Sequence, residues 1–506
     1  MSDQQFMAAM GTIALGIGAL AVWKNEQYLK ELLVINFEKI GMVGYAVFAG
    51  IMFLLSRKYK SWTREFSQRT RLLSKLWSDR SSVYVGETLD DGEVYIPDRV
   101  RTGHVQIIGA TGRGKTDSVV LPWFMQDLAR GKSAVLIDGK GEHALLERIE
   151  RYAEPINTKV ISFDLGHVEK SAATNPLMMG TAQQITDRIF AAFEFEDPFY
   201  KAVQYEITGF VVQGLIESNE VVTFKRLYEV LTEDEKLSEL AGKAKSVQAR
   251  LARWLSESKK DREQKLAGIV SQLGPFAQGE IASFVNGPVE GREFFSLAEM
   301  LTVSEEKKKE MSEGKNLAVV ILLPTLLYQE IAFKLGKMFL QETAWAVAAR
   351  REKSFTPIFL DEFSSFVYPG FNSILNKARS SGIALHLSHQ SLGDLEQVSK
   401  DFAKAVNTNT NVKCLLGLND PDTADFFAKH IGTKGEEKIT ERGKRGGFFS
   451  PRERTGDVSI REVEAYKVHP NRLKNYMSGE GVIQFALPEG TIVEEIKFHR
   501  LPAEPA

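Results

Sequence analysis

Residues 104–116 read HVQIIGATGRGKT, and this stretch decides the fold. The apolar run HVQII is typical of a buried strand, and the next eight residues fit the phosphate-binding pattern G-x-x-x-x-G-K-[ST]. Residues 117–130, DSVVLPWFMQDLAR, then have a helical pattern. A strand, a glycine-rich loop and a helix in this order predict a P-loop, whose backbone N–H groups and helix N-terminus form an anion site.

The loop supplies the predicted nucleotide-binding residues. Lys115 is expected to reach the β- and γ-phosphates of ATP, and the Thr116 hydroxyl is expected to ligate Mg²⁺. The alternative, a glycine-rich turn with an exposed lysine, is disfavoured by the strand and helix on either side. The full predicted cofactor-binding set is Gly109, Ala110, Thr111, Gly112, Arg113, Gly114, Lys115 and Thr116.

A P-loop needs an acidic partner at the end of a neighbouring strand, and the chain offers two. Asp138 follows AVLI, and Asp361 follows PIFL. We predict Asp361 as the metal-binding residue because Glu362 comes next and could polarise the attacking water. Asp138 is expected on the adjacent strand in a supporting role, with an ordinary strand-end turn as an equal alternative.

Two further polar residues complete the predicted catalytic set, which is Lys115, Glu362, Gln390 and Arg379. Gln390 follows the strand-like IALHLS and could sense the γ-phosphate through a hydrogen bond that hydrolysis removes. Arg379, in NKARSSG just before that strand, could reach a neighbouring subunit's nucleotide as an arginine finger. The alternatives are a turn glutamine and a surface arginine.

Beyond the P-loop, unbroken apolar runs alternate with helical patterns. This alternation predicts an α/β fold with a doubly wound, parallel-rich central sheet covered on both faces. The strand-like VYVG and EVYIP come shortly before the P-loop. The main expected strands span 104–108, 133–138, 158–164, 317–324, 357–363, 383–388, 411–418 and 481–487.

Between about 182 and 310 the strand pattern stops, and amphipathic helical patterns follow one another. Because strands resume at 317, we expect an all-α domain inserted into the nucleotide-binding domain. The predicted domains are residues 1–80, a nucleotide-binding domain made of 81–181 and 311–506, and the insertion 182–310.

Residues 1–80 have a different character. The uncharged runs 6–23 and 40–55 predict a hairpin of two transmembrane helices, although the second is short for a span. Basic residues dominate 57–80, which places that flank in the cytoplasm by the positive-inside rule. The alternatives are a cleaved signal peptide ending near Ala21 and a soluble buried hairpin.

The overall composition is that of a folded protein. The chain has 506 residues, a net charge of -2, 43% hydrophobic residues and one cysteine, which excludes a disulfide scaffold and a wholesale basic coat. Cys414 lies in an apolar run and is expected in the core. Residues 434–455 are charged and glycine-rich, and they are expected to form an exposed loop.

Taken together, these motifs have a familiar order. An N-terminal membrane hairpin, GATGRGKT, LIDGKGE, Asn-Pro-Leu at 175–177, an inserted helical region, FLDEF and ARSSGIALHLSHQSLGDL follow one another. The chain resembles the type IV coupling proteins of bacterial conjugation, the TraD/TrwB/TraG-like DNA-transfer ATPases. One departure is Asp138-Gly139, where the family often has Asp-Pro.

The resemblance implies a homohexameric ring of RecA-like P-loop domains at the bacterial inner membrane, multi-pass and with its bulk in the cytoplasm. It implies ATP and Mg²⁺ as cofactors and, as partners, relaxase-bound single-stranded DNA, relaxosome proteins and a type IV secretion channel. The same roles fall on Lys115, Thr116, Asp361, Glu362 and Gln390, with Arg379 acting in trans. The alternatives are a receptor ATPase for secreted effector proteins, an FtsK/HerA-like translocase of duplex DNA, and a structural ring that binds ATP for assembly.

Overall fold

The computed structural model describes residues 81–351, 353–444 and 453–502. The predicted membrane hairpin, with its runs 6–23 and 40–55, lies outside these ranges. Within the described ranges, no helix combines the length and the apolar character that a membrane span needs.

Eleven strands form one sheet, in the order β2-β1-β15-β14-β11-β3-β10-β9-β4-β8-β5. The seven strands from β11 to β5 run parallel, and the other four pair antiparallel at one edge. The strands are Ser82–Thr88 (β1), Glu93–Pro97 (β2), Val105–Ile108 (β3), Ala134–Asp138 (β4), Thr158–Asp164 (β5), Asn316–Leu322 (β8), Thr356–Asp361 (β9), Ile383–His389 (β10), Val412–Leu416 (β11), Glu480–Leu487 (β14) and Gly490–Phe498 (β15).

The eight main predicted strands are present, each to within two residues at either end. The inner parallel strands β3, β4, β9, β10 and β11 are buried along their whole length, which is why their sequences are mostly apolar and do not alternate with exposed polar residues. The last predicted strand, β14, runs antiparallel to β11, and a turn of two residues joins it to β15, its antiparallel neighbour on the other side. The sheet is therefore mixed, with a parallel-rich centre.

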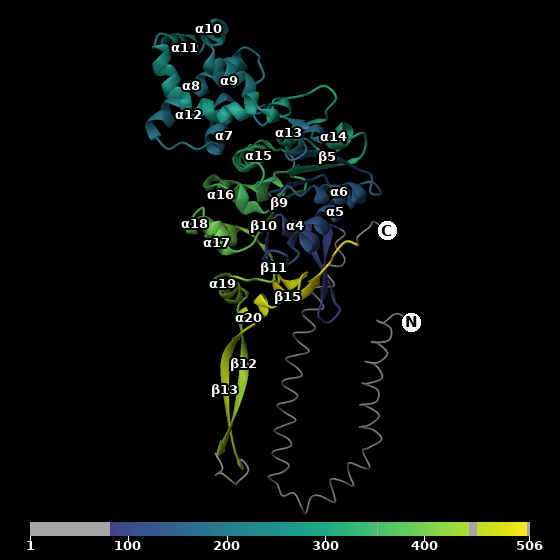
Figure 1. The fold of residues 1–506 in the computed structure, drawn as a ribbon. Coiled ribbons are helices and arrows are strands. Elements are labelled where there is room, and N and C mark those ends of the chain that lie inside the picture. The colour runs from purple at the N-terminus through teal and green to yellow at the C-terminus, as the bar shows by residue number, and fades with distance from the viewer. Residues whose placement is uncertain (1–80, 352, 445–452, 503–506) are drawn as a thin grey trace, which may run out of the picture. The chain divides into compact units, whose positions relative to one another are not determined.

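Helices cover both faces of the sheet. The connections from β3 to β4 and from β4 to β5 step one way along the sheet, whereas those from β8 to β9, β10 and β11 step the other way. Right-handed crossovers then place the first group of helices on one face and the second on the other, as Figure 1 shows. The first group is Leu121–Ala129 (α5) and His143–Ala153 (α6); the second is Gln329–Ala349 (α15), Asn372–Ala378 (α16), Leu392–Glu396 (α17) and Lys400–Asn409 (α18).

The region expected to be an insertion is helical. The chain enters and leaves it side by side, through the short parallel pair Ala173–Thr174 (β6) and Phe294–Phe295 (β7). Its limits as a separate domain stay a prediction. The helices between β6 and β7 are Ala182–Ala192 (α7), Pro198–Glu217 (α8), Phe224–Thr232 (α9), Asp234–Lys243 (α10), Gln248–Leu255 (α11) and Lys259–Gln278 (α12). Two more, Leu297–Thr302 (α13) and Glu305–Met311 (α14), follow β7 and lead back to β8.

In the described parts of 434–455 the expectation of a loop is wrong, and residues 445–452 lie outside the described ranges. Thr433–Lys444 (β12) and Glu453–Tyr466 (β13) pair as a long antiparallel two-stranded sheet. Each strand satisfies the backbone groups of the other, so a segment with charged and glycine-rich composition still forms regular structure. The pattern of residue types alone did not show this pairing.

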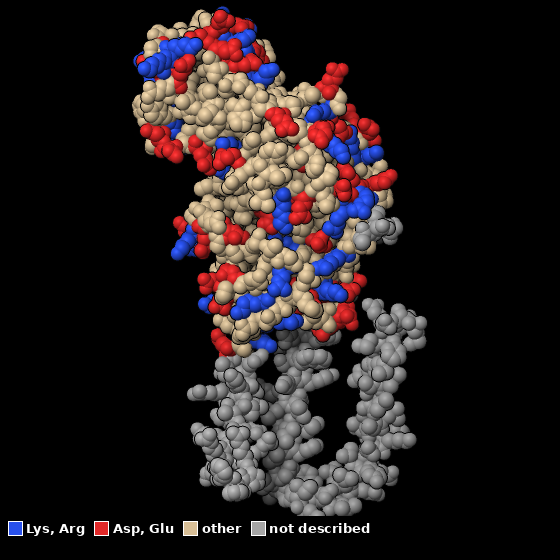
Figure 2. Space-filling view, in the orientation of Figure 1, with Lys and Arg blue, Asp and Glu red and all other residues tan. Residues whose placement is uncertain are grey.

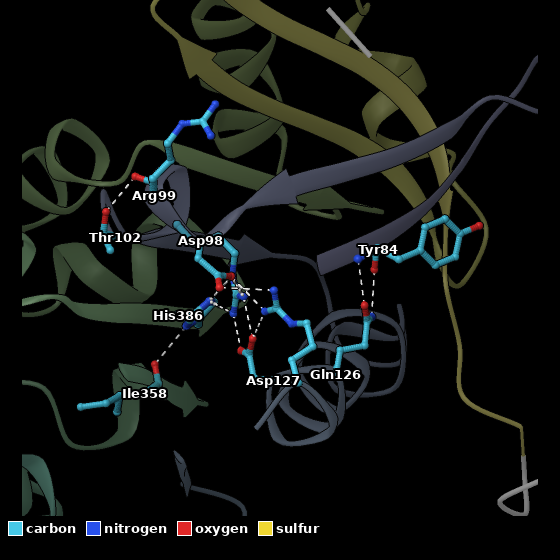
Figure 3. Close-up of polar contacts among 10 residues, drawn as sticks. Tyr84, Asp98, Arg99, Thr102, Gln126, Asp127, Ile358 and His386 are labelled. Atoms are coloured by element: carbon cyan, nitrogen blue, oxygen red, sulfur yellow. Dashed lines mark hydrogen bonds and ion pairs between the residues drawn. The ribbon is translucent and has the colours of Figure 1, made fainter. Parts of the chain in front are cut away.

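A buried group of charged and polar side chains connects a short helix to α5 and to β10. Arg101, in the short helix Asp98–Arg101 (α4), donates to both carboxylate oxygens of Asp127 on α5, at 2.8 and 2.5 Å. The same guanidinium contacts Asp98 at 3.1 Å and the Nε2 of His386 on β10 at 2.9 Å. Figure 3 shows Asp98, Asp127 and His386 converging on this point.

Removal of this guanidinium is expected to destabilise the fold strongly. Arg101 is fully buried, and its loss would leave the Asp127 carboxylate with Arg130 as its remaining charged partner. Breaking a buried pair costs about 3–5 kcal/mol, and because Arg130 stays we expect the lower end of that range, with a corresponding fall in the unfolding midpoint of Arg101→Met in denaturant. Arg99→Met is the control, because Arg99 is exposed on the same short helix; equal losses in both variants would contradict the prediction.

Candidate nucleotide-binding site

The predicted P-loop lies between β3, the parallel strand flanked by β11 and β10, and the helical run that continues into α5. That run begins with one turn of π-helix, Thr116–Val120. Gly112 and Gly114 have φ of +75° and +86°, a backbone region that favours glycine. The loop therefore turns at the carboxyl ends of the parallel strands, where open α/β sheets bind their ligands.

Lys115 is held inside the loop. Its Nζ donates to the carbonyl oxygen of Gly109 at 2.8 Å and lies 3.9 Å from a carboxylate oxygen of Glu362. Burial lowers the pKa of the Lys115 ammonium, and the Glu362 charge acts in the opposite direction. A buried ammonium next to the glycine turns is placed to meet an anion.

Two carboxylates and a hydroxyl lie at the start of the helix. Asp138 and Asp361 are opposite each other on the neighbouring parallel strands β4 and β9, and Thr116 Oγ1 donates to Asp361 Oδ2 at 2.6 Å. Burial, and then the charge of Asp361, raises the pKa of the Asp138 carboxyl. These oxygen donors are of the kind that Mg²⁺ prefers, and a divalent cation would relieve the repulsion between the carboxylates. The residues fit the predicted metal.

Glu362 adopts a left-handed backbone conformation, with φ of +47°, which is costly for a residue other than glycine. This conformation turns the chain sharply after β9 and leaves the side chain among polar partners. Its Oε1 lies 3.4 Å from Lys140 Nζ, and its Oε2 accepts from Gln390 Nε2 at 3.3 Å. The carboxylate is thereby held at the edge of the P-loop.

Gln390 connects the P-loop to this carboxylate. Its Oε1 accepts a hydrogen bond from Thr111 Oγ1 at 3.0 Å while its Nε2 donates to Glu362. The residue directly follows β10, and its own backbone N–H donates to Asp394 at the start of α17. A strand-end amide that joins the loop to the predicted catalytic acid has the position expected of a phosphate sensor.

Arg379 does not join this group. It is exposed in the 3₁₀ turn Arg379–Ser381, before β10, whereas Gln390 follows β10. Seven strand residues separate the two ends, a distance of about 20 Å at roughly 3.3 Å per residue. Arg379 cannot reach the nucleotide site of its own subunit from there, so any role at a nucleotide must be in trans.

Three contacts at the site were not predicted from the sequence. Lys140 forms an ion pair with Glu362, as described above. The Gly139 N–H donates to the backbone oxygen of Asp361 at 3.1 Å, a bond that proline could not make, so the departure from Asp-Pro has a structural use here. Arg113, predicted to line the phosphate site, instead donates to the backbone oxygen of Tyr476 at 3.1 Å.

A cavity of about 280 Å³ opens beside the loop. It is bordered by P-loop residues on one side and by Lys140, Glu142 and Arg148 on the other. The structure thus brings together Lys115, Thr116, Asp361, Glu362 and Gln390 from three strand ends; their individual catalytic roles stay predictions.

Comparisons with known proteins agree with this architecture. Residues 356–473 match the family described as the TraM recognition site of TraD and TraG. The chain is 23% identical over 470 positions to the type 4 coupling protein DotL of Legionella pneumophila, which covers 78% of this chain. The match spans 58% of the length of that relative.

Solved structures show the same fold. The unbound conjugative coupling protein TrwBdeltaN70 superposes with a TM-score of 0.58 and 16% identity, over 83% of this chain and 91% of that one. TrwB in complex with ADP and Mg²⁺ gives 0.58 and 14%, over 86% and 92%. VirB4 of Thermoanaerobacter pseudethanolicus gives 0.51 and 16%, over 84% and 98%. The fold is that of the TrwB coupling protein, and the resemblance to the type IV coupling proteins is confirmed.

Proposed function

We propose that this relative of the type IV coupling proteins hydrolyses ATP to bring relaxase-bound DNA to a type IV secretion channel at the bacterial inner membrane. The observation that carries the proposal is the chain of contacts from Thr111 through Gln390 to Glu362. It joins the phosphate loop, a strand-end sensor and a water-activating acid, which is the set a hydrolysing motor needs. An ATP-binding ring used for assembly alone would not require the acid.

The predicted site residues have separate roles in ATP hydrolysis. Bound ATP and Mg²⁺ would supply the transferable phosphoryl group and the charge that stabilises its transfer. Thr116 and Asp361 hold the metal, and the Lys115 ammonium binds the phosphate end. Glu362 accepts the proton of the attacking water on its carboxylate, which Lys140 keeps in position.

Gln390 would report the outcome of hydrolysis. Its amide is shared between Thr111 and Glu362, so a γ-phosphate that engages it must change one of these contacts. Gln390 directly follows β10, and Arg379 lies just before it. The strand therefore connects Gln390, at the carboxyl ends of the parallel strands, to Arg379, at their amino ends. We place Arg379 at the nucleotide of a neighbouring subunit in a homohexamer, held at the membrane through residues 1–80.

DNA contacts on the face shown in Figure 2 are expected to be local. Lys and Arg side chains are interspersed there with Asp and Glu, so that face has no large basic field. A hollow of about 1000 Å³ at the amino ends of β3 and β11 is bordered by Arg379, Lys400 and Lys404. Lys400 and Lys404 are exposed one turn apart on α18, a spacing that suits contacts to successive phosphates.

The test is the ATPase rate of the full chain in detergent, with single-stranded or duplex DNA, across a range of salt concentrations. We expect stimulation by single-stranded DNA that falls steeply as salt rises, because each phosphate contact releases counterions. The double variant Lys400→Ala/Lys404→Ala should reduce the slope of log affinity against log salt by about one unit per lost contact.

Lys497→Ala is the matched control, since Lys497 is exposed on β15, away from this hollow. It should keep the wild-type slope. Preferred stimulation by duplex DNA would favour the duplex translocase. No stimulation by either form, in preparations that form rings, would replace DNA by a secreted protein as the cargo.

A further inference from the structure

Three side chains with metal-binding atoms meet at the carboxyl end of β5, and none of the three borders the nucleotide cavity. Asp164 is the last residue of β5, His167 follows three residues later, and His143 begins α6. The Nδ1 atoms of both histidines face the same oxygen, Asp164 Oδ2, at 2.8 and 2.9 Å. Within the described part of the chain, this is the group of His, Cys, Asp and Glu side chains that could hold a metal ion.

The carboxylate is held firmly in its orientation. The other oxygen of Asp164, Oδ1, accepts from the backbone N–H of Gly166 at 2.8 Å. The Asp164 backbone N–H in turn donates to Ser171 Oγ at 2.9 Å. One carboxylate oxygen is thus fixed by the loop, and the other is presented to the two imidazoles. Such outer hydrogen bonds orient the ligands of metal sites.

We propose that His143, Asp164 and His167 bind a divalent transition-metal ion such as zinc. Two imidazole nitrogens and one carboxylate oxygen are a donor set that suits zinc, whereas Mg²⁺ prefers oxygen ligands alone. The ligand atoms of a tetrahedral zinc site lie roughly 3.4 Å apart, so each histidine need retreat from Asp164 by only about 0.5 Å. Three protein ligands leave a fourth position open.

The site is accessible from one side. The Asp164 side chain is 2% exposed, whereas those of His143 and His167 are 28% and 45% exposed. An ion can therefore enter from the surface and keep a water or an outside ligand. The ring centroids of His143 and His167 are only 4.1 Å apart. A cation bound between their Nδ1 atoms and Asp164 would contact all three side chains, in place of the two contacts that the histidines make to the same carboxylate oxygen.

A bound ion would connect two segments of the chain, one next to the nucleotide cavity and one that leads to the helical region. His143 comes directly after Glu142, which borders the nucleotide cavity. His167 lies in the connection that leads through β6 into α7 and the helical region. Figure 1 shows α6 beside β5, so the ion would join the first turn of α6 to the exit from β5. This site is independent of the proposed motor function.

The test uses the full chain in detergent, carrying an affinity tag without histidine and stripped with a chelator. Zinc is titrated in competition with a chromophoric chelator, and Co²⁺ is used for its visible absorption spectrum. We expect one ion per chain and a rise in the unfolding midpoint with zinc. His167→Ala should weaken binding at least tenfold and abolish that rise, whereas His430→Ala, which removes an exposed histidine on the helix Pro421–Ile431 (α19), should change neither.

Asp361→Asn separates this site from the nucleotide site, because it alters the predicted magnesium ligand and leaves the histidines intact. It should retain one zinc ion per chain. Circular dichroism of His167→Ala shows that the variant is folded. The proposal is overturned if wild type binds no ion, or if binding is lost in Asp361→Asn and kept in folded His167→Ala.

Discussion

Glu362→Gln is expected to bind ATP with nearly wild-type affinity and to lose hydrolysis by about a hundred- to ten-thousandfold. The amide keeps the size of the side chain and can still contact Gln390 and Lys140, but it cannot take a proton from water. Phosphate release at saturating ATP measures the loss, and equilibrium binding of a fluorescent ATP analogue measures the affinity.

The matched control is Glu150→Gln, which changes the same functional group on the exposed face of α6. Its turnover should equal that of the unaltered chain. Normal turnover by Glu362→Gln would remove this residue from the mechanism and leave its left-handed backbone conformation without a catalytic reason.

Lys115→Ala should abolish nucleotide binding as well as turnover. The Lys115 ammonium is 5% exposed and donates to Gly109 within the loop, so its removal takes away a buried cation at the phosphate site. Loss of one partner of a buried charged pair costs about 2–5 kcal/mol, which corresponds to a roughly 30-fold or larger rise in the dissociation constant. Isothermal titration with a non-hydrolysable ATP analogue gives the value.

Lys132→Ala serves as the comparison, because Lys132 lies in the loop after α5 and outside the cavity. It should bind the analogue as wild type does. If Lys115→Ala binds the analogue as tightly as wild type does, phosphate recognition depends on the backbone of the loop alone. The proposed role of Lys115 in nucleotide binding would then be wrong.

The centre of the sheet could be predicted because its information is local. Buried parallel strands such as β3 and β9 need continuous apolar sequence, and glycines with positive φ mark the loop that follows β3. The antiparallel edge carries less of this information. β15, beside β14, combines exposed, half-buried and buried residues in no regular order, and its sequence GTIVEEIKF offers no long apolar run.

The candidate site was predictable where each residue follows its own strand. Asp361, Glu362 and Gln390 all come at strand ends, and parallel strands bring such ends together. Lys140 was missed because its partner Glu362 is far along the chain and only the pairing of β4 with β9 makes them neighbours. The sequence did offer one signal for Lys140. Asp138 and Asp361 were both predicted at the ends of neighbouring strands, so the residues that follow Asp138 must lie near Glu362.

The histidine group illustrates the same limit. His143 and Asp164 are 21 residues apart, and neither lies in a spacing that indicates a metal site. They meet because β5 lies beside β8 at the end of the sheet and α6 returns across its face. The signal in the sequence was weak: an Asp at the end of a predicted strand, followed three residues later by a histidine.

The pairing of β1 with β15 has a mechanical consequence. The strands are antiparallel, with Gly86 opposite Phe498 and Thr88 opposite Ile496, so the start of β1 and the finish of β15 leave the pair at the same end. A force that pulls these two ends apart, across the strands, would break the hydrogen bonds one after another. A force applied to the start of β1 along the strand, with the rest of the sheet held fixed, would act on all of these hydrogen bonds at once. The attachment of this domain to residues 1–80 is therefore strong or weak according to the direction of pull.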